Sequence, residues 1–183
     1  IYSHGIPYIS MICHGVVWLT RFFMGFSGNA MAFFLSTYTN KVDKKGRVSV
    51  PAPFRAALAD QLHHGIVVFS SSGHTCLEGF DWAKMEEISA RMDHYDLFSD
   101  EQDDLATTIF GESVQLFVDG DGRITLPQDL MQSAQILSKA TFVGLGRKFQ
   151  IWSPELFDLR KSQARGAVQD KKLTIPANNG GGK

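Results

Sequence analysis

Two short segments of the chain alternate polar and apolar residues. They are Arg47–Val50 and Arg123–Leu126, and both contain β-branched residues. This alternation predicts two half-buried β-strands. Each segment is followed by a proline, which cannot donate a hydrogen bond to a strand ladder and suits the first turn of a helix. The pattern therefore predicts a short helix after each strand, over Ala52–Leu62 and Gln128–Leu137.

Further along, each half of the chain contains a pair of apolar runs. In the first half, Ile66–Phe69 is followed by Cys76–Glu78, and in the second half, Thr141–Leu145 is followed by Phe149–Trp152. The connections, 70–75 and 146–148, contain glycine, as hairpin loops often do. Each pair of runs is therefore predicted to form a β-hairpin.

The two halves also share a motif. Segment Val42–Pro51 has a counterpart at Val118–Pro127, 76 positions later, with Val, Asp, Gly, Arg and Pro in the same register. In each copy, Asp-x-x-Gly predicts a turn: the Asp carboxylate accepts hydrogen bonds from backbone N–H groups ahead of it, and Gly takes the left-handed conformation. The predicted turn residues are Asp43 and Gly46 in the first copy and Asp119 and Gly122 in the second. The Arg that follows each glycine is expected to pair with the Asp of its turn. Duplication is the simplest explanation of the two copies.

One copy thus reads as strand, turn, strand, short helix and hairpin. Such a unit is too small to bury a core alone, so two copies are expected to pack together. The predicted fold class is mainly β with short helices (α+β). We expect a first half-domain at residues 37–84, a helical and acidic linker at 85–112, and a second half-domain at 113–156. Residues 157–183 are expected to hold the end of a helix and a disordered tail.

Helical spacing of apolar residues predicts a helix over Trp82–Met92. The segment Asp93–Asp104 follows with acidic residues and no Lys or Arg, which indicates a solvated linker and lacks the spacing of a calcium loop. Another helix is predicted over Pro154–Gln163. The polar, glycine-ending tail from Ala167 to Lys183 is predicted to be disordered.

Residues 1–30 differ from the rest of the chain. They contain no acidic residue and only one Lys or Arg, Arg21, and are rich in apolar residues and glycine. The apolar part, Ile9–Phe26, is long enough to suggest a membrane helix, but polar residues interrupt it and no positive region precedes it. We expect residues 1–30 to be an upstream extension that arises from a translation start assigned too early. A membrane anchor is the alternative.

Composition and charge limit the classes of function that the protein can have. Hydrophobic residues make up 44% and charged residues 20% of the chain, as in a globular protein with a real core. The net charge of −1 means that any nucleic-acid binding must come from local charge. Cys13 and Cys76 form no disulfide framework, and with His63, His64 and His74 they match no zinc pattern. No phosphate-binding loop is found. We therefore expect no metal, no cofactor and no enzymatic activity.

Positive charge is concentrated near the first motif. The basic residues of this region are Lys41, Lys44, Lys45, Arg47 and Arg55, and Asp43 is the only acidic residue between positions 41 and 55. A guanidinium can form two parallel hydrogen bonds with a phosphate or a guanine edge, which suits Arg47 to DNA contact. Arg123 is the counterpart in the second motif, where Gly120 and Asp121 replace the two lysines of the loop. The second copy is therefore expected to be a weaker DNA contact.

These residues give the chain a specific resemblance. Segment Lys41–Pro51 with Phe54-Arg55, the second Asp119-x-x-x-Arg123, and Val143–Gly146 leading to Ile151-Trp152 resemble the MraZ family, over about residues 33–159. The resemblance implies a duplicated swapped-hairpin barrel of the AbrB type. It implies regulation of the bacterial cell-division and cell-wall gene cluster through short direct DNA repeats. It also implies a ring-shaped homo-oligomer, a cytoplasmic and nucleoid location, and DNA contact by the Asp-x-x-x-Arg elements.

Two other functions stay open at this point. The same fold could serve as a protein-interaction module, as antitoxin-type members of the wider superfamily do. The chain could also be tethered to a membrane through residues 1–30, although we expect no membrane partner. Direct repeats in the DNA upstream of the gene would favour the regulator.

Overall fold

The computed structural model of the protein describes residues 32–59, 61, 65–96 and 98–176. The two halves contain the same elements in the same order. The first half has β1 (Thr37–Lys41), β2 (Arg47–Ser49), α1 (Ala52–Ala57), β3 (Ile66–Ser70) and β4 (Leu77–Phe80). The second half has β5 (Val114–Leu116), β6 (Arg123–Thr125), α4 (Gln128–Ser133), β7 (Lys139–Gly144) and β8 (Phe149–Trp152). The prediction of a mainly β fold with short helices, built from a repeated unit, is confirmed.

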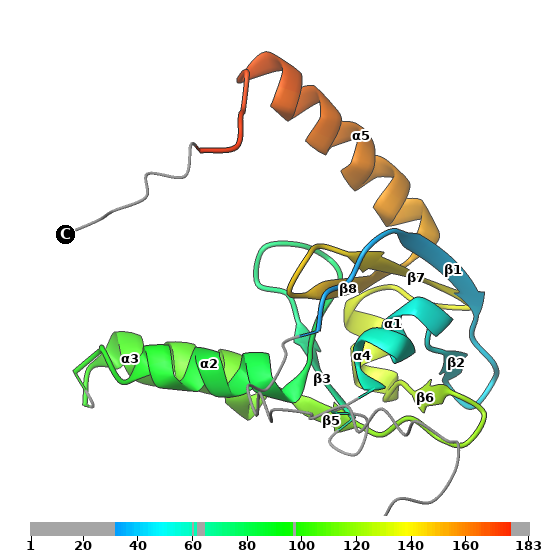
Figure 1. The fold of residues 1–183 in the computed structure, drawn as a ribbon, viewed down its shortest axis with the longest axis horizontal. Coiled ribbons are helices and arrows are strands. Elements are labelled where there is room, and N and C mark those ends of the chain that lie inside the picture. The colour runs from blue at the N-terminus through cyan, green and yellow to red at the C-terminus, as the bar shows by residue number, and fades with distance from the viewer. Residues whose placement is uncertain (1–31, 60, 62–64, 97, 177–183) are drawn as a thin grey trace, which may run out of the picture.

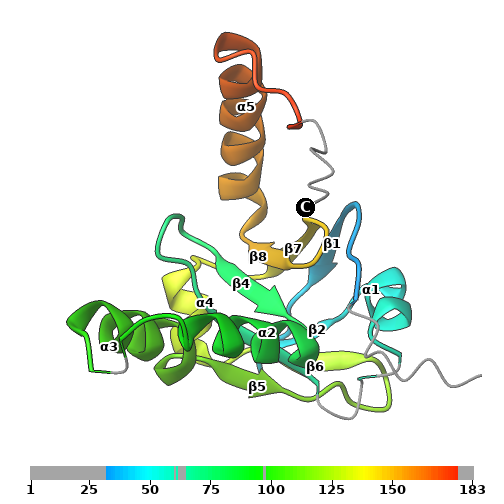
Figure 2. The same ribbon diagram turned by 60° about the vertical axis from the view of Figure 1, so that its left-hand side comes forward.

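Four further elements lie outside this repeat. Between the halves, α2 (Trp82–Met92) and α3 (Asp100–Ala106) are followed by a π-helical turn (Thr107–Gly111). After the second half comes α5 (Pro154–Asp170). Figures 1 and 2 show that α5 and the α2–α3 pair leave the strand-rich body in different directions. The strands and short helices therefore form the body, from which two helical arms project.

The two halves exchange strands. A six-stranded sheet has the order β1-β7-β8-β4-β3-β5, so β1 of the first half pairs with β7 of the second, and β5 of the second pairs with β3 of the first. The remaining strands, β2 and β6, form a separate antiparallel ribbon. Neither half could keep these pairings alone. The exchange agrees with the swapped arrangement that the sequence resemblance implies.

The main core lies between the sheet and the ribbon. Its centre is a group of fully buried phenylalanine rings from both halves, with neighbouring ring centroids 4.9–6.3 Å apart. The rings belong to Phe34, Phe54, Phe142 and Phe149. Val48 and Ile124, the central residues of the ribbon strands, point into the same core. Because burial removes apolar area from water, this shared core holds the two halves together.

Several predicted boundaries were wrong. The helices expected over Ala52–Leu62 and Gln128–Leu137 end at Ala57 and Ser133, and Gln135 has a positive φ of 53° that closes the second. The last helix continues beyond Gln163 to Asp170, so Ala167–Asp170 is helical and not disordered. No residue of α5 is buried. Beyond its first turns, which contact the sheet, the helix is therefore stabilised by local helix propensity and not by packing.

The acidic segment is partly helical. Its second part forms α3, whose first turn holds Asp100, Glu101 and Asp103. Carboxylates are favourable near a helix N-terminus, where the dipole is positive. The Ser99 hydroxyl caps the same turn, where it accepts a hydrogen bond from Gln102 N at 3.2 Å. The four carboxylates of α3 are exposed, as predicted for a solvated segment.

Residues 1–30 and the end of the tail lie outside the described residues, so the predictions made for them are untested. Within residues 32–176, apart from the gaps noted above, no helix has both the length and the apolar character that crossing a membrane requires.

Candidate nucleic-acid interface

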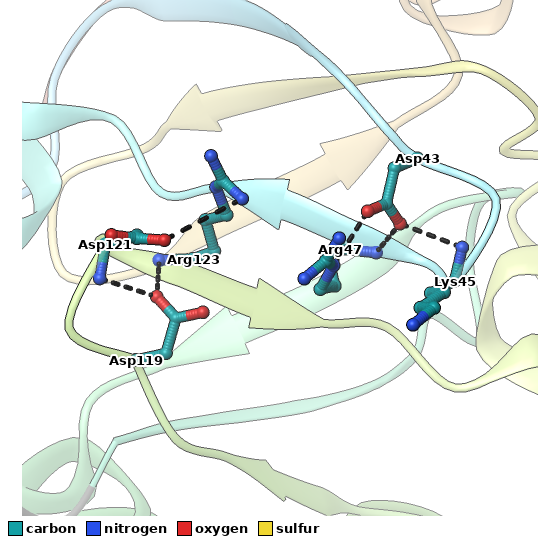
Figure 3. Close-up of polar contacts among 6 residues, drawn as sticks. All are labelled: Asp43, Lys45, Arg47, Asp119, Asp121 and Arg123. Atoms are coloured by element: carbon teal, nitrogen blue, oxygen red, sulfur yellow. Dashed lines mark hydrogen bonds and ion pairs between the residues drawn. The ribbon is translucent and has the colours of Figure 1, made fainter.

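The first motif folds into a turn held by one carboxylate. Oδ1 of Asp43 accepts hydrogen bonds from the backbone N–H groups of Lys45 and Arg47 at 2.8 and 2.9 Å, and the carbonyl of Asp43 accepts one from Gly46 N at 3.0 Å. Gly46 has a φ of 79°, in the left-handed region that favours glycine. The other carboxylate oxygen, Oδ2, lies 2.7 Å from Nε of Arg47 (Figure 3). The predicted turn is confirmed.

These hydrogen bonds stabilise the ionised form of Asp43. The hydrogen bond from the backbone N–H of Arg47 has the largest effect and lowers the pKa of the Asp43 carboxyl from its ordinary value of 3.8; desolvation opposes it, and the Arg47 side chain and the N–H of Lys45 lower the pKa further. Hydrogen bonds to the charged form of a group favour that form. The carboxylate is therefore charged at neutral pH and can both cap the turn and orient the guanidinium.

The second motif repeats the turn but not the ion pair. Oδ1 of Asp119 accepts from the N–H groups of Asp121 and Arg123 at 3.0 and 2.8 Å, and Gly122 has a φ of 75°. The Arg123 guanidinium, however, is directed to Asp121, with Nη1 and Oδ2 3.9 Å apart (Figure 3). The expectation that Asp119 would pair with Arg123 was therefore wrong. The acid that replaces a lysine of the first turn attracts the guanidinium instead.

The ribbon brings the two motifs together. In its register, Arg47 faces Thr125, Val48 faces Ile124, and Ser49 faces Arg123. Since side chains alternate along a strand and Val48 and Ile124 point inward, Arg47 and Arg123 both lie on the outer face. Their side chains are 43% and 41% exposed. Two arginines that are 76 positions apart in the sequence thus share one surface.

Each turn is also bonded to the strand of the other half. The N–H of Val50 donates to the carbonyl of Gly122 at 2.9 Å, and the N–H of Leu126 donates to the carbonyl of Gly46 at 2.9 Å. The two contacts are equivalent under the 76-residue offset. They extend the ribbon at both ends and relate the two turns by approximate twofold symmetry.

The predicted lysines surround the first turn. Lys44 and Lys45 are exposed in the loop, and Lys41 is exposed at the end of β1. Lys41, Arg47 and Arg123 line one surface hollow together with Asn40, Val42, Asp43 and Ser49. The hollow therefore joins the two copies of the motif in one cationic surface.

The sequence analysis did not include Lys139. It is directly opposite Lys41 in the pairing of β1 with β7, and both lysines are exposed. Like charges in this position repel, which makes the pair a place where an anion would be favourable. Lys139 lies outside the repeated motif, so only the register of the exchanged strand could reveal it.

Arg55 was grouped with the first turn, but it lies at the second. A Cβ atom built on Gly122 would be 2.1 Å from Nη1 of Arg55 and 2.6 Å from its Cζ. The residue equivalent to Arg55 in the second half is Met131, whose Sδ would lie 3.3 Å from a Cβ on Gly46. Each short helix thus places a side chain over the turn of the opposite half.

The described residues give no support to catalytic or metal chemistry. Within them, no group of three His, Cys, Asp or Glu side chains is placed to hold a metal. His63 and His64 lie outside them, and the ring of His74 lies 5.8 Å from that of Trp152. Burial, and then the charge of Glu78, raise the pKa of the Cys76 thiol to about 12. The thiol is therefore neutral and poorly nucleophilic at physiological pH.

Comparison with known proteins gives a consistent result. Residues 33–107 and 109–172 each match the sequence profile of the MraZ protein family, whose description includes the term antitoxin-like. Similar proteins named transcriptional regulator MraZ come from Rickettsia typhi, Rickettsia rickettsii and Rickettsia akari, at 44%, 43% and 42% identity. Each alignment covers 145 residues, 79% of this chain and 97% of the relative. The two matches along one chain agree with the duplication.

Proposed function

This chain belongs to the MraZ family of transcriptional regulators, and we propose that it contacts operator DNA through the outer face of the β2–β6 ribbon. The membership confirms the resemblance drawn from the sequence. It also confirms the expectation that the protein is not an enzyme, because the family is one of regulators. The proposal concerns the surface, the residues and the form of the DNA.

The observation that carries the proposal is the shared face of Arg47 and Arg123. Both side chains are about two-fifths exposed on one ribbon, and a turn held by an Asp carboxylate precedes each. A two-stranded ribbon fits the major groove of DNA, where arginine reads guanine through O6 and N7. Lys41, Lys44 and Lys45 surround this face and would meet phosphates, which position the protein but carry no sequence information.

Repetition of this surface would compensate for the net charge of −1. Affinity for DNA grows with the number of phosphates neutralised, so a ring-like homo-oligomer that presents the ribbon several times would bind a series of short direct repeats. We propose this arrangement upstream of the cell-division and cell-wall genes, in the cytoplasm and on the nucleoid. The alternative, an antitoxin-like protein-interaction module, would not require the exposed arginines.

The proposal is tested with Arg47→Ala and a matched control, Arg165→Ala, which removes the same charge from the exposed side of α5. The probe is the duplex upstream of the protein's own coding sequence. Loss of one good arginine–base contact costs about 1–3 kcal/mol per subunit. We expect Arg47→Ala to lose that affinity in a gel-shift assay, with an unchanged circular dichroism spectrum, and Arg165→Ala to bind as the wild type does. Equal affinities for all three proteins would refute the assignment of the ribbon.

A salt titration is the second test. If the lysines and Arg47 of several subunits meet phosphates, affinity must fall steeply as salt rises, by a slope of about 0.9 per phosphate contact on logarithmic axes. A flat dependence would show that the ribbon face does not meet the DNA backbone.

A further inference from the structure

The two turns differ in their own charge. The first turn, residues 43–47, carries three basic residues and one acidic residue, whereas the second, residues 119–123, carries one basic and two acidic residues. The net charges are therefore +2 and −1. A DNA-binding face that uses both turns would meet phosphates unequally, unless another element supplies positive charge to the second turn.

The structure places such a charge there. The guanidinium of Arg55 lies against Gly122, so close that a Cβ on this glycine would overlap Nη1, at 2.1 Å, and Cζ, at 2.6 Å. Gly122 is adjacent in the chain to Arg123, whose side chain points outward on the ribbon. Arg55 therefore belongs to the first half by sequence but to the second turn by position.

The chemistry of Arg55 leaves it able to bind an anion. Among the described residues, no carboxylate lies within ion-pair distance of its guanidinium. Its Nε is buried without a hydrogen-bond partner there, while the side chain as a whole is half-buried. Nη1 and Nη2 are thus the donors that can meet a ligand. A guanidinium without a carboxylate beside it is suited to bidentate contact with a phosphate.

Only the second turn has a charged side chain from the short helix of the other half beside it. Met131 occupies the equivalent position over Gly46, where the first turn already has Lys44 and Lys45. The uncharged residue thus covers the turn that is rich in lysine, and the charged residue covers the turn that lacks it. The strand exchange makes this possible, because each short helix lies next to the turn of the other half.

We propose that Arg55 and Arg123 form one composite phosphate-binding site at the second turn, with a cation from each half of the chain. The proposal rests on the proposed function, since its ligand is the DNA backbone. It raises the net charge at the second turn from −1 to zero and makes that turn a DNA contact in spite of Asp119 and Asp121. Gly122 is required because any side chain there would displace the guanidinium.

The test uses Arg55→Met, which copies the residue at the equivalent position of the other half, and a mixed-sequence DNA duplex, because phosphate contacts do not depend on sequence. Loss of one phosphate contact per subunit should lower the slope of log affinity against log salt concentration by about 0.9. The ratio of wild-type to variant affinity should therefore be about eightfold greater at ~0.1 M salt than at ~1 M. Arg55→Lys keeps the charge and should retain most of the slope. A role confined to packing would not distinguish lysine from methionine in this way.

Double-mutant cycles then locate the contact. Combined with Arg123→Ala, Arg55→Met should lose less affinity than the sum of the single losses, because both residues meet the same phosphate. Combined with Arg47→Ala, the losses should add. An unchanged slope in Arg55→Met, or stronger coupling to Arg47 than to Arg123, would overturn the composite site.

Two controls separate the outcomes. Melting temperatures of all variants identify any loss that comes from unfolding, and if Arg55→Met does not fold, Arg55→Gln, which removes the charge but keeps a polar side chain, replaces it in the salt titration and in the cycles. If the wild-type protein binds neither this duplex nor the duplex upstream of its own coding sequence at low salt, the proposed function fails. If it binds and Arg55→Met binds with the same salt slope, only the composite site fails.

Discussion

The glycines of the two turns offer a matched pair of substitutions, Gly46→Ala and Gly122→Ala. Their φ angles are 79° and 75°, both in the left-handed region. An alanine at either position therefore carries the same backbone penalty, about 1–2 kcal/mol. The added methyl groups, however, meet different neighbours. At Gly46 the methyl would lie 2.5 Å from the carbonyl oxygen of Leu126, whereas at Gly122 it would meet the end of the Arg55 side chain.

The difference between these neighbours sets the magnitudes. The Leu126 carbonyl belongs to the backbone that follows β6, and the N–H of Leu126 is bonded to Gly46 itself at 2.9 Å, so the strand must shift. Overpacking of this kind costs roughly a further 1–3 kcal/mol. The Arg55 guanidinium can rotate away instead. We therefore expect Gly46→Ala to lower the free energy of unfolding by about 2–5 kcal/mol and Gly122→Ala by about 1–2 kcal/mol.

Thermal unfolding at one protein concentration measures the difference, with about 2–4 °C of melting temperature per kcal/mol for a chain of this length. DNA affinity should show a second effect, because Gly122→Ala displaces Arg55 from the second turn and should reduce the salt slope as Arg55→Met does. A melting temperature for Gly122→Ala as low as that of Gly46→Ala would refute the reasoning. It would show that Arg55 cannot move aside.

Arg123→Ala should weaken DNA binding less than Arg47→Ala, because the first turn stays the more positive one; gel shifts at one salt concentration compare them, and a greater loss for Arg123→Ala would contradict this order. Asp43→Ala should lower the melting temperature by an amount that is constant from neutral pH to about the ordinary carboxyl pKa of 3.8 and shrinks below it, because the lowered pKa of Asp43 keeps its stabilising charge until the carboxyl is protonated in the folded state. A difference that shrinks already near neutral pH would exclude that carboxylate as the cause. Cys76, whose pKa is about 12, should resist alkylation at neutral pH in the folded protein and react after denaturation, as mass spectrometry of its peptide can show. Rapid labelling of the native protein would mean that the thiol is not buried.

The features that the sequence determined by itself are local ones. The turns at Asp43 and Asp119 form because each carboxylate bonds N–H groups two and four residues ahead, within a segment that also contains the required glycine. The helix over Trp82–Met92 and the strand over Phe149–Trp152 have the predicted bounds. In these cases the signal and its physical cause lie in the same few residues. Interactions of this range need no knowledge of distant partners.

Tertiary structure alone decided which distant segments meet. The Thr39 and Thr141 hydroxyls lie 2.9 Å apart across 102 positions, in strands whose patterns do not specify each other as partners. That exchange places Lys139 opposite Lys41, and the packing of α1 against the other half places Arg55 at Gly122. The order of the strands depends on the shared core and on the closure of long loops, which are properties of the whole chain. For this reason the sequence identified most of the cationic residues, whereas only the fold showed which of them act together.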